Sequence, residues 1–385
     1  MTDFPKHTEI VVIGGGVMGA STAYHLALRG ARDVALLEKE SFFGTGATGR
    51  CAGGVRYQFS TEVNIRLSQA SLPMLDRFEE EMGQAIDRRR CGYYLLLTRE
   101  QDVPPFQRNV ELQHRLGVPT QWLSGDEVRR RFPYLRADDV LAATVCSEDG
   151  LADPNGVVAG YVNGARRLGV RLAADTAVHA ITHHANQYTI HTNQGDIQCQ
   201  KIVNAAGPWA GLISDMLGVP LPITPLRRQW ITTTPLPDLP PDFPFIIFFG
   251  QSLYFHPEGR GLLTGMSNPH EKPGFDQAID EEWELVHLEA AIQRLPLLEK
   301  AGRQSGLAGL YEMTPDAHPV ISGVPGMDGY YVVAGFSGHG FMHGPIAGKL
   351  MAEIMLDGAA HTVDVGMLDY ARFADGRLIQ EYNVV

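Results

Sequence analysis

The sequence predicts an α/β protein in which a dinucleotide-binding domain, closed by both ends of the chain, carries an inserted domain with an antiparallel sheet. Residues 10–39 read as a strand, a glycine turn, a helix and a second strand. Residues 330–356 repeat the order of strand, glycine turn and helix at the opposite end of the chain. Between them, residues 223–234 and 245–266 alternate apolar and polar side chains and are rich in aromatic residues, which is typical of antiparallel strands.

The first glycine turn has the spacing of a dinucleotide-binding site. Gly14 permits a tight turn, Gly16 lets backbone N–H groups approach a pyrophosphate, and Gly19 lets the helix pack close to the sheet. The phosphates would then lie at the positive end of the helix, beside Val17 and Met18.

The second strand of this unit ends in Glu38 and Lys39. Glu38 lies 24 residues after Gly14, close to the ~20 residues expected for the acid that binds the ribose hydroxyls. Strand, turn, helix and acid together predict a dinucleotide site. A βαβ unit with a chance glycine turn is the alternative.

The composition excludes several classes of function. A chain of 385 residues with 44% hydrophobic and 20% charged residues is long enough for about two to three domains. Its net charge of −12 argues against nucleic acid or an anionic membrane as the main partner. Residues 1–8 are polar, so we expect no signal peptide, and no apolar run reaches the ~18 residues of a membrane span.

The cysteines are widely spaced and form no CxxC pair, which predicts a reducing, cytoplasmic location and excludes a cysteine metal site. They are Cys51, Cys91, Cys146 and Cys199.

Residues 44–56 form a loop rich in small residues, which we expect to pack its backbone against a flat or phosphorylated group. A flexible loop is the alternative. The expected cofactor contacts in this loop are Gly46, Ala47, Thr48, Arg50, Cys51, Ala52 and Gly53.

Apolar periodicity divides the rest of the chain into helices and strands. The expected helices are 62–82, 103–116, 124–131, 154–168, 281–295 and 342–356. The expected cofactor domain comprises residues 1–85, 140–222 and 313–385, and the expected substrate domain comprises residues 86–139 and 223–312.

These motifs together resemble the D-amino-acid oxidase superfamily. Residues 14–19 with 38–39 resemble its FAD adenosine site, and residues 202–209 resemble its second flavin strand. Residues 313–316 followed by 334–341 closely resemble the C-terminal signature of sarcosine oxidase.

A further motif is more particular. Residues 53–59, with 64–66, resemble the β subunits of dye-linked L-proline dehydrogenase and heterotetrameric sarcosine oxidase. They also resemble a related mitochondrial complex I assembly flavoprotein.

The resemblance implies a glutathione-reductase-type, Rossmann-like FAD-binding domain with an inserted antiparallel-sheet substrate domain. It implies oxidation of the C–N bond of a secondary or primary amino acid, of the sarcosine, proline or glycine type. A hydride would pass to flavin N5, and the resulting imine would hydrolyse. Further implied cofactor contacts are Val178, Ala206, Gly207, Trp209, Gly335, Gly338, His339, Gly340, Phe341 and Met342.

Three residues are candidates for the chemistry. Arg56 matches the family's carboxylate-binding arginine, since a guanidinium binds both carboxylate oxygens at once; a structural ion pair is the alternative. Tyr254 would form the substrate wall, or else be a core tyrosine. The backbone around His339 would donate to the flavin pyrimidine oxygen as negative charge develops there. A base role for its side chain is open, although hydride transfer does not require one.

Three departures from monomeric sarcosine oxidase shape the expected activity. Gly309 stands where that family tethers its flavin through cysteine, which predicts noncovalent FAD; a tether through Cys51 is the alternative. Met342 replaces a lysine that binds the substrate carboxylate. Leu263 aligns near the lysine that promotes reaction with oxygen, so a dehydrogenase that passes electrons to an acceptor or partner subunit is favoured.

The rival functions are a true H2O2-producing oxidase and a non-catalytic flavoprotein scaffold or assembly factor. A nicotinamide-dependent dehydrogenase is disfavoured by the glycine–histidine–glycine unit at residues 338–340.

Overall fold

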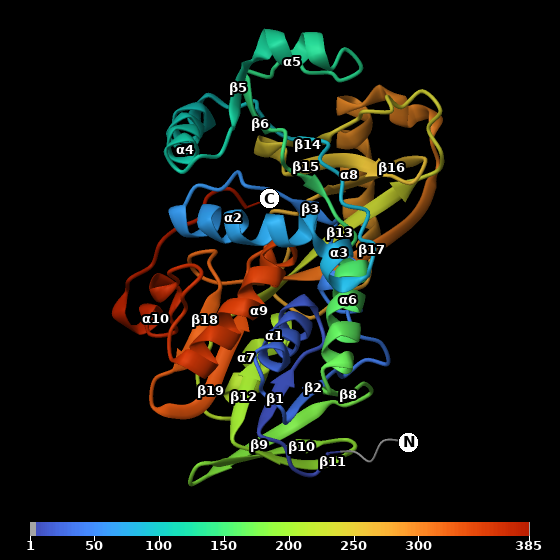
Figure 1. Cartoon of the computed structure of the whole chain (residues 1–385). Helices are drawn as coiled ribbons and strands as arrows, with labels where there is room; N and C mark the ends of the chain where they lie inside the picture. Colours follow the sequence, from blue (N-terminus) through green and yellow to red (C-terminus); the bar gives the residue numbers. More distant parts are fainter. Residues whose placement is uncertain (1–4, 385) are drawn as a thin grey trace.

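A computed structural model describes residues 5–384 and shows two sheets with helices packed against them (Figure 1). The lower sheet has six strands in the order β18-β19-β12-β1-β2-β8, and every neighbouring pair is parallel except β18–β19. Its strands are β1 (Ile10–Ile13), β2 (Val34–Leu37), β8 (Arg171–Ala173), β12 (Lys201–Asn204), β18 (Val320–Val324) and β19 (Met327–Ala334).

Helices cover one face of this sheet, and a small antiparallel sheet covers the other. Ile10 and Val12 of β1 pack against the helices, whereas Val11 and Ile13 pack against the small sheet, as the two-residue period of a strand requires. Helices α1 (Val17–Leu28) and α9 (Gly340–Asp357) contact the strands, and α2 (Glu62–Asp76), α3 (Phe78–Met82) and α6 (Pro154–Arg167) pack around these two helices. The opposite face carries β9 (Val178–His184), β10 (Gln187–Thr192), β11 (Gly195–Cys199) and α7 (Ala210–Asp215).

The upper sheet has eight strands in the order β17-β13-β16-β15-β14-β4-β6-β5. Its neighbours are antiparallel except for β14 and β4, which run parallel. The strands are β4 (Tyr93–Leu97), β5 (Gln121–Ser124), β6 (Ala142–Cys146), β13 (Thr224–Thr233), β14 (Phe245–Phe248), β15 (Leu253–Glu258), β16 (Gly261–Met266) and β17 (Arg303–Met313). The associated helices are α4 (Val103–Arg115), α5 (Gly125–Arg131) and α8 (Glu281–Arg294).

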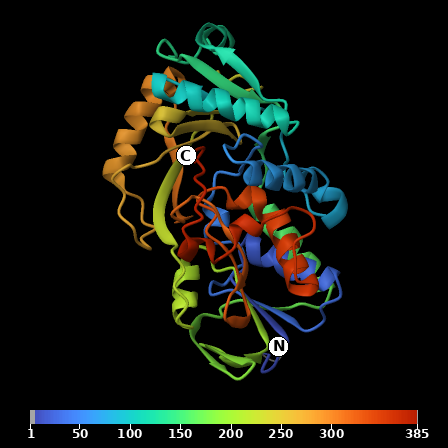
Figure 2. The same cartoon turned by 90° about the vertical axis from the view of Figure 1, so that its left-hand side faces the viewer.

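The two-stranded pair β3 (Gly54–Val55) and β7 (Gly150–Leu151) lies between the two sheets. The C-terminal end of the chain also comes back to this region, as both views show (Figure 2). Segments distant in the sequence therefore meet where the two sheets adjoin.

The predicted fold class is confirmed, with two differences in detail. The helix expected over residues 62–82 is two helices, α2 and α3; Pro73, which has no N–H to donate, lies one turn before the break. Strand β6, within the segment 140–222 expected in the cofactor domain, pairs with β4 and β5 of the upper sheet. Residues 1–4 and 385 of the expected domain segments lie outside the described residues.

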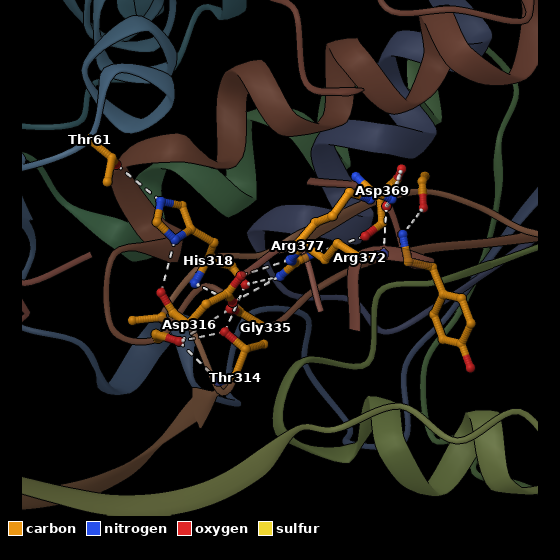
Figure 3. A network of polar contacts seen from close by, with 12 residues as sticks. Thr61, Thr314, Asp316, His318, Gly335, Asp369, Arg372 and Arg377 are labelled. Atoms are coloured by element: carbon orange, nitrogen blue, oxygen red, sulfur yellow. Dashed lines mark hydrogen bonds and ion pairs between the residues drawn. The ribbon is translucent and has the colours of Figure 1, made fainter. Parts of the chain in front are cut away.

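A buried ion pair fixes the segment that follows β17 (Figure 3). Asp316 is 1% exposed, and it accepts hydrogen bonds from Nε (2.8 Å) and Nη2 (3.1 Å) of Arg372, which is fully buried. Arg372 lies in the short helix α10 (Arg372–Asp375) and also donates to the His318 carbonyl at 2.8 Å. The bidentate geometry holds residues 314–318 against the C-terminal part of the chain.

We predict that Arg372→Met lowers the free energy of unfolding by about 3–5 kcal/mol, because it leaves the Asp316 carboxylate buried without a cation. Urea unfolding followed by circular dichroism measures this change. Arg377→Met is the matched control: Arg377 pairs with Asp369 and Asp375 at the surface, so its loss should leave the midpoint nearly unchanged. Equal effects of the two substitutions would contradict the assignment.

Candidate active site

A cavity of about 250 Å³ runs along the carboxyl ends of β1 and β12, where the two glycine turns meet. The turn at Gly14–Gly16 lines one side, and Gly338, Gly340 and Phe341 line the other. We call this the cofactor cavity. Predicted contacts that line it are Gly14, Gly16, Val17, Met18, Glu38, Lys39, Gly46, Ala47, Thr48, Cys51, Val178, Ala206, Gly207, Trp209, Gly338, Gly340 and Phe341.

The first glycine turn leaves no room for side chains. Gly14 has φ +109°, and a Cβ there would lie 2.4 Å from the carbonyl oxygen of Ala205. A Cβ on Gly19 would lie 1.8 Å from the carbonyl oxygen of Gly14, so only glycine lets α1 approach the turn this closely. Gly16 is the N-cap of α1 and supplies no side-chain acceptor. The N–H of Val17 donates to Thr48 Oγ1 at 3.2 Å, so the N–H groups that remain suited to an anion are those of the residues that follow it.

Glu38, the acid at the end of β2, forms a hydrogen bond to the first glycine turn. Glu38 Oε2 accepts a hydrogen bond from the backbone N–H of Gly15 at 2.7 Å. Burial raises the pKa of Glu38. Beside it, Lys39 Nζ lies 3.4 Å from the centre of the Trp209 ring, which places a cation–π pair at this end of the cofactor cavity.

A second, smaller cavity of about 100 Å³ adjoins the first, beneath the upper sheet. We call it the substrate cavity. The two cavities share lining residues, including Cys51, Tyr311 and Gly338. A ligand in the substrate cavity would therefore lie next to a cofactor in the cofactor cavity. Predicted residues that line only the substrate cavity are Arg50, Ala52, Gly53, Arg56, Tyr254, His339 and Met342.

Two predicted cofactor contacts, Gly19 and Gly335, line neither cavity. Gly335 has φ +87°, and a Cβ there would lie 2.6 Å from Thr314 Cγ2. Both glycines thus shape the turns that border the cofactor cavity.

Arg56 is 5% exposed, and two of its N–H groups already donate to main-chain carbonyl groups. Its Nη1 donates to the Gln58 carbonyl and its Nη2 to the Asn383 carbonyl. The guanidinium carbon lies 4.0 Å from the centre of the Phe59 ring. Carbonyl groups carry no net charge, and no carboxylate of the described chain forms a direct ion pair with Arg56, although the buried Asp149 is near enough to interact with its charge.

Asp149 holds the loop that carries Arg56. It is fully buried and accepts hydrogen bonds from the Tyr57 N–H (2.7 Å) and from Gln58 Nε2 (2.9 Å). Burial raises the pKa of Asp149 to about 7.

Aromatic side chains form much of the substrate cavity wall. Tyr93 and Phe245 stack with ring centres 4.0 Å apart. Tyr254 lies across Gly265 of the neighbouring strand, where a Cβ would come within 2.3 Å of its hydroxyl. Such a wall suits a small ligand with an apolar body.

His339 is buried and its groups are used internally. Its backbone N–H donates to the Phe336 carbonyl at 3.0 Å, so the free donors at the start of α9 come from the residues that follow. Its Nε2 lies 3.1 Å from the Ala317 carbonyl and its Nδ1 lies 3.3 Å from Nδ1 of His343. Burial lowers the pKa of His339 to about 3, so the ring is neutral at pH 7.

Sequence reasoning missed Glu312, a buried carboxyl in the wall of the cofactor cavity. Its Oε1 accepts a hydrogen bond from the Phe336 N–H at 3.2 Å, whereas its Oε2 has no hydrogen-bond partner within the described residues. Burial raises the pKa of Glu312 to about 7. The available signal was its place directly before the motif at residues 313–316.

Sequence reasoning also missed Arg228 and Trp230, both in the substrate cavity. They lie two residues apart on β13, and the strand period places them on the same face. The alternation along the strand was visible in the sequence, but it did not show which face of the strand lies toward the cavity.

Neither a metal site nor a membrane span is found in the part of the chain that the structure describes. No group of three or more histidine, cysteine or acidic side chains among residues 5–384 could hold a metal ion. No helix in the same range is long and apolar enough to cross a bilayer.

The known proteins that this chain resembles in sequence include dehydrogenases and FAD-dependent oxidoreductases. The chain is 30% identical over 377 residues to mitochondrial dimethylglycine dehydrogenase of Rattus norvegicus, covering 92% of this chain and 44% of the relative. It therefore spans less than half the length of that protein. It is 27% identical over 429 residues to FAD-dependent oxidoreductase domain-containing protein 1 of Mus musculus, covering 99% of this chain and 88% of the relative.

A solved structure agrees over almost the whole fold. The crystal structure of L-proline dehydrogenase from P. horikoshii has a TM-score of 0.89 and 33% sequence identity, covering 97% of this chain and all of that chain. A family model described as FAD dependent oxidoreductase (DAO) matches residues 9–354. The two glycine turns, the cofactor cavity between them and this match lead to one conclusion: the chain belongs to the DAO family of FAD dependent oxidoreductases.

Proposed function

We propose that this enzyme oxidises the C–N bond of a small secondary or primary amino acid, of the sarcosine, proline or glycine type. The observation that carries this proposal is a cationic, aromatic cavity that adjoins the cofactor cavity at the second glycine turn. FAD, when bound, would accept a hydride from a carbon bonded to the amine nitrogen of the substrate, and the resulting imine would hydrolyse. The names of the relatives, dimethylglycine dehydrogenase and L-proline dehydrogenase, support the same substrate class.

The residues of the cofactor cavity fit a dinucleotide. The start of α1 offers N–H groups for a pyrophosphate, and the unpartnered Oε2 of Glu312 offers an acceptor for a cofactor hydroxyl. At the other end, the first turn of α9 directs N–H groups at the pocket that Phe341 and Gly338 line. There they would stabilise negative charge on the ring system.

The residues of the substrate cavity would bind and orient the amino acid. Tyr254, Tyr93 and Phe245 would exclude water from the reacting carbon. The resemblance gives Arg56 the role of carboxylate ligand. Because its Nη groups already donate to carbonyls, we propose that it attracts the substrate carboxylate through its positive charge. The neutral His339 would support the turn without exchanging a proton at neutral pH.

We propose a dehydrogenase that uses an acceptor or a partner subunit, in preference to an oxidase. No lysine is among the residues that line the substrate cavity within the described chain. A lysine ammonium beside the ring would stabilise superoxide as it forms, and Leu263, its expected position, is a buried residue of β16.

The FAD would be held without a covalent bond. Gly309 has no side chain that could form a bond to the flavin. Burial raises the pKa of the Cys51 thiol to about 12, which keeps it protonated and weakly nucleophilic.

The four cysteines are free thiols, which supports a reducing compartment. We propose the cytoplasm; the mitochondrial relatives make the mitochondrion the alternative.

We predict that anaerobic addition of sarcosine, dimethylglycine, L-proline or glycine bleaches the yellow absorbance of the bound flavin with at least one of them. Aerobic turnover with an artificial dye should then reduce the dye without stoichiometric peroxide. Peroxide release at the turnover rate would identify an oxidase. A flavin that no amine bleaches would favour a non-catalytic scaffold.

We predict that acid precipitation releases all of the FAD into the supernatant, as absorbance of the two fractions would show. Flavin retained on the denatured chain would instead mean a covalent link. In that case Cys51→Ser would be the first variant to examine.

We predict that Glu312→Gln stabilises the FAD-free protein more at pH 8 than at pH 5. The folded-state pKa of about 7 lies above the unfolded value of ~4.3. Wild-type stability therefore falls as the pH rises from ~4 to ~7 and stays lower above that range. Removal of the charge should recover up to about 4 kcal/mol at pH 8. Thermal or urea unfolding at both pH values measures the difference, and an equal effect at both would contradict the prediction.

A further inference from the structure

The substrate cavity carries three guanidinium groups and no acid. Arg50, Arg56 and Arg228 line it, and no aspartate or glutamate is among its described lining residues. A site with this charge selects an anionic group. The three arginines differ in how their donors are used.

Two of the three arginines each donate two hydrogen bonds to main-chain carbonyl groups. Arg56 donates to two carbonyl groups, as described above. Arg50 donates from Nη1 to the Ala308 carbonyl at 2.8 Å and from Nε to the Thr45 carbonyl at 3.3 Å. In each of these two guanidinium groups, two of the three nitrogen atoms therefore hold the side chain to the main chain.

Arg228 is different. Its Nη1 donates to the Arg227 carbonyl at 2.9 Å, but its buried Nε has no hydrogen-bond partner among residues 5–384. No carboxylate of the described chain forms an ion pair with it, and burial lowers its pKa. Its guanidinium carbon lies 5.2 Å from the centre of the Tyr311 ring, at the border with the cofactor cavity.

The neighbouring Arg227, on the same strand, is an arginine whose charge is balanced by acidic side chains. It forms ion pairs with Glu271 (3.2 Å), Asp276 (3.0 Å) and Asp280 (3.5 Å). Successive side chains of β13 point to opposite faces of the sheet, so Arg227 faces these acids while Arg228 faces the cavity. A buried guanidinium without an anion is costly, and a bound carboxylate would offset that cost with bidentate geometry.

We propose that Arg228 makes the direct contact with the substrate carboxylate. This inference rests on the proposed amino-acid oxidation and adds the residue that recognises the acid. The carboxylate accepts from Arg228 beside Tyr311, which places the amino acid between the aromatic wall and the cofactor cavity. Arg56 strengthens the binding through its charge alone.

The test compares an anionic and an uncharged probe. Pyrrole-2-carboxylate and its amide are titrated into the FAD-loaded enzyme, and the perturbation of the flavin spectrum gives each dissociation constant. The wild type should bind the carboxylate more tightly than the amide. Arg228→Gln should weaken carboxylate binding about 10- to 100-fold and leave amide binding nearly unchanged. Arg228→Lys should keep part of the preference, because it retains the charge without the planar fork.

Arg227→Gln is the matched control, since it removes the same side chain from the same strand but from the other face. It should leave the preference for the carboxylate unchanged. Retention of the wild-type preference in Arg228→Gln, with its loss in Arg56→Gln, would overturn the inference. A wild-type enzyme that binds the two probes equally, or binds neither, would overturn it as well.

The two proposals can fail separately. If no amine bleaches the flavin while Arg228→Gln still abolishes the preference for the carboxylate, then amine oxidation is wrong and the anion site stands. If amines bleach the flavin but Arg228→Gln binds both probes as the wild type does, only the role of Arg228 is wrong.

Discussion

The structure depends on the close contact between α1 and α9, the helices that follow the two glycine turns. A Cβ on Gly348 would lie 2.3 Å from Ser21 Oγ, and one on Gly344 would lie 2.4 Å from Val17 Cγ2. Ser21 also donates to the Pro345 carbonyl at 3.1 Å. Because both helices begin at the edge of the cofactor cavity, this packing sets the distance between the two turns.

This contact explains how segments from the two ends of the chain form one cofactor site. The positive ends of α1 and α9 border a single cavity. An extended dinucleotide can use one for its phosphates and the other for its ring. The upper sheet then needs only to cover the ring end, and its mixed strand order allows loops and a C-terminal segment to contribute to the wall.

The sequence predicted the features that local spacing encodes. The glycine turn, the helix after it and the acid at Glu38 lie within 30 residues, and their geometry follows from backbone rules. The orientation of Arg228 could not be predicted, because alternation tells which residues share a face but not which face meets the cavity. One partner of Arg56, Asn383, lies 327 residues away in the sequence, and no local pattern predicts such a contact. Glu312 was hidden for a similar reason: its burial depends on the packing of β17 against the second glycine turn.

The path of the C-terminal segment has a practical consequence for handling the protein. Glu381 is anchored by Ser60, Thr61 and Asn64, and Val384 lines the substrate cavity. A preparation in which a protease has removed this segment would therefore lack part of the cavity wall.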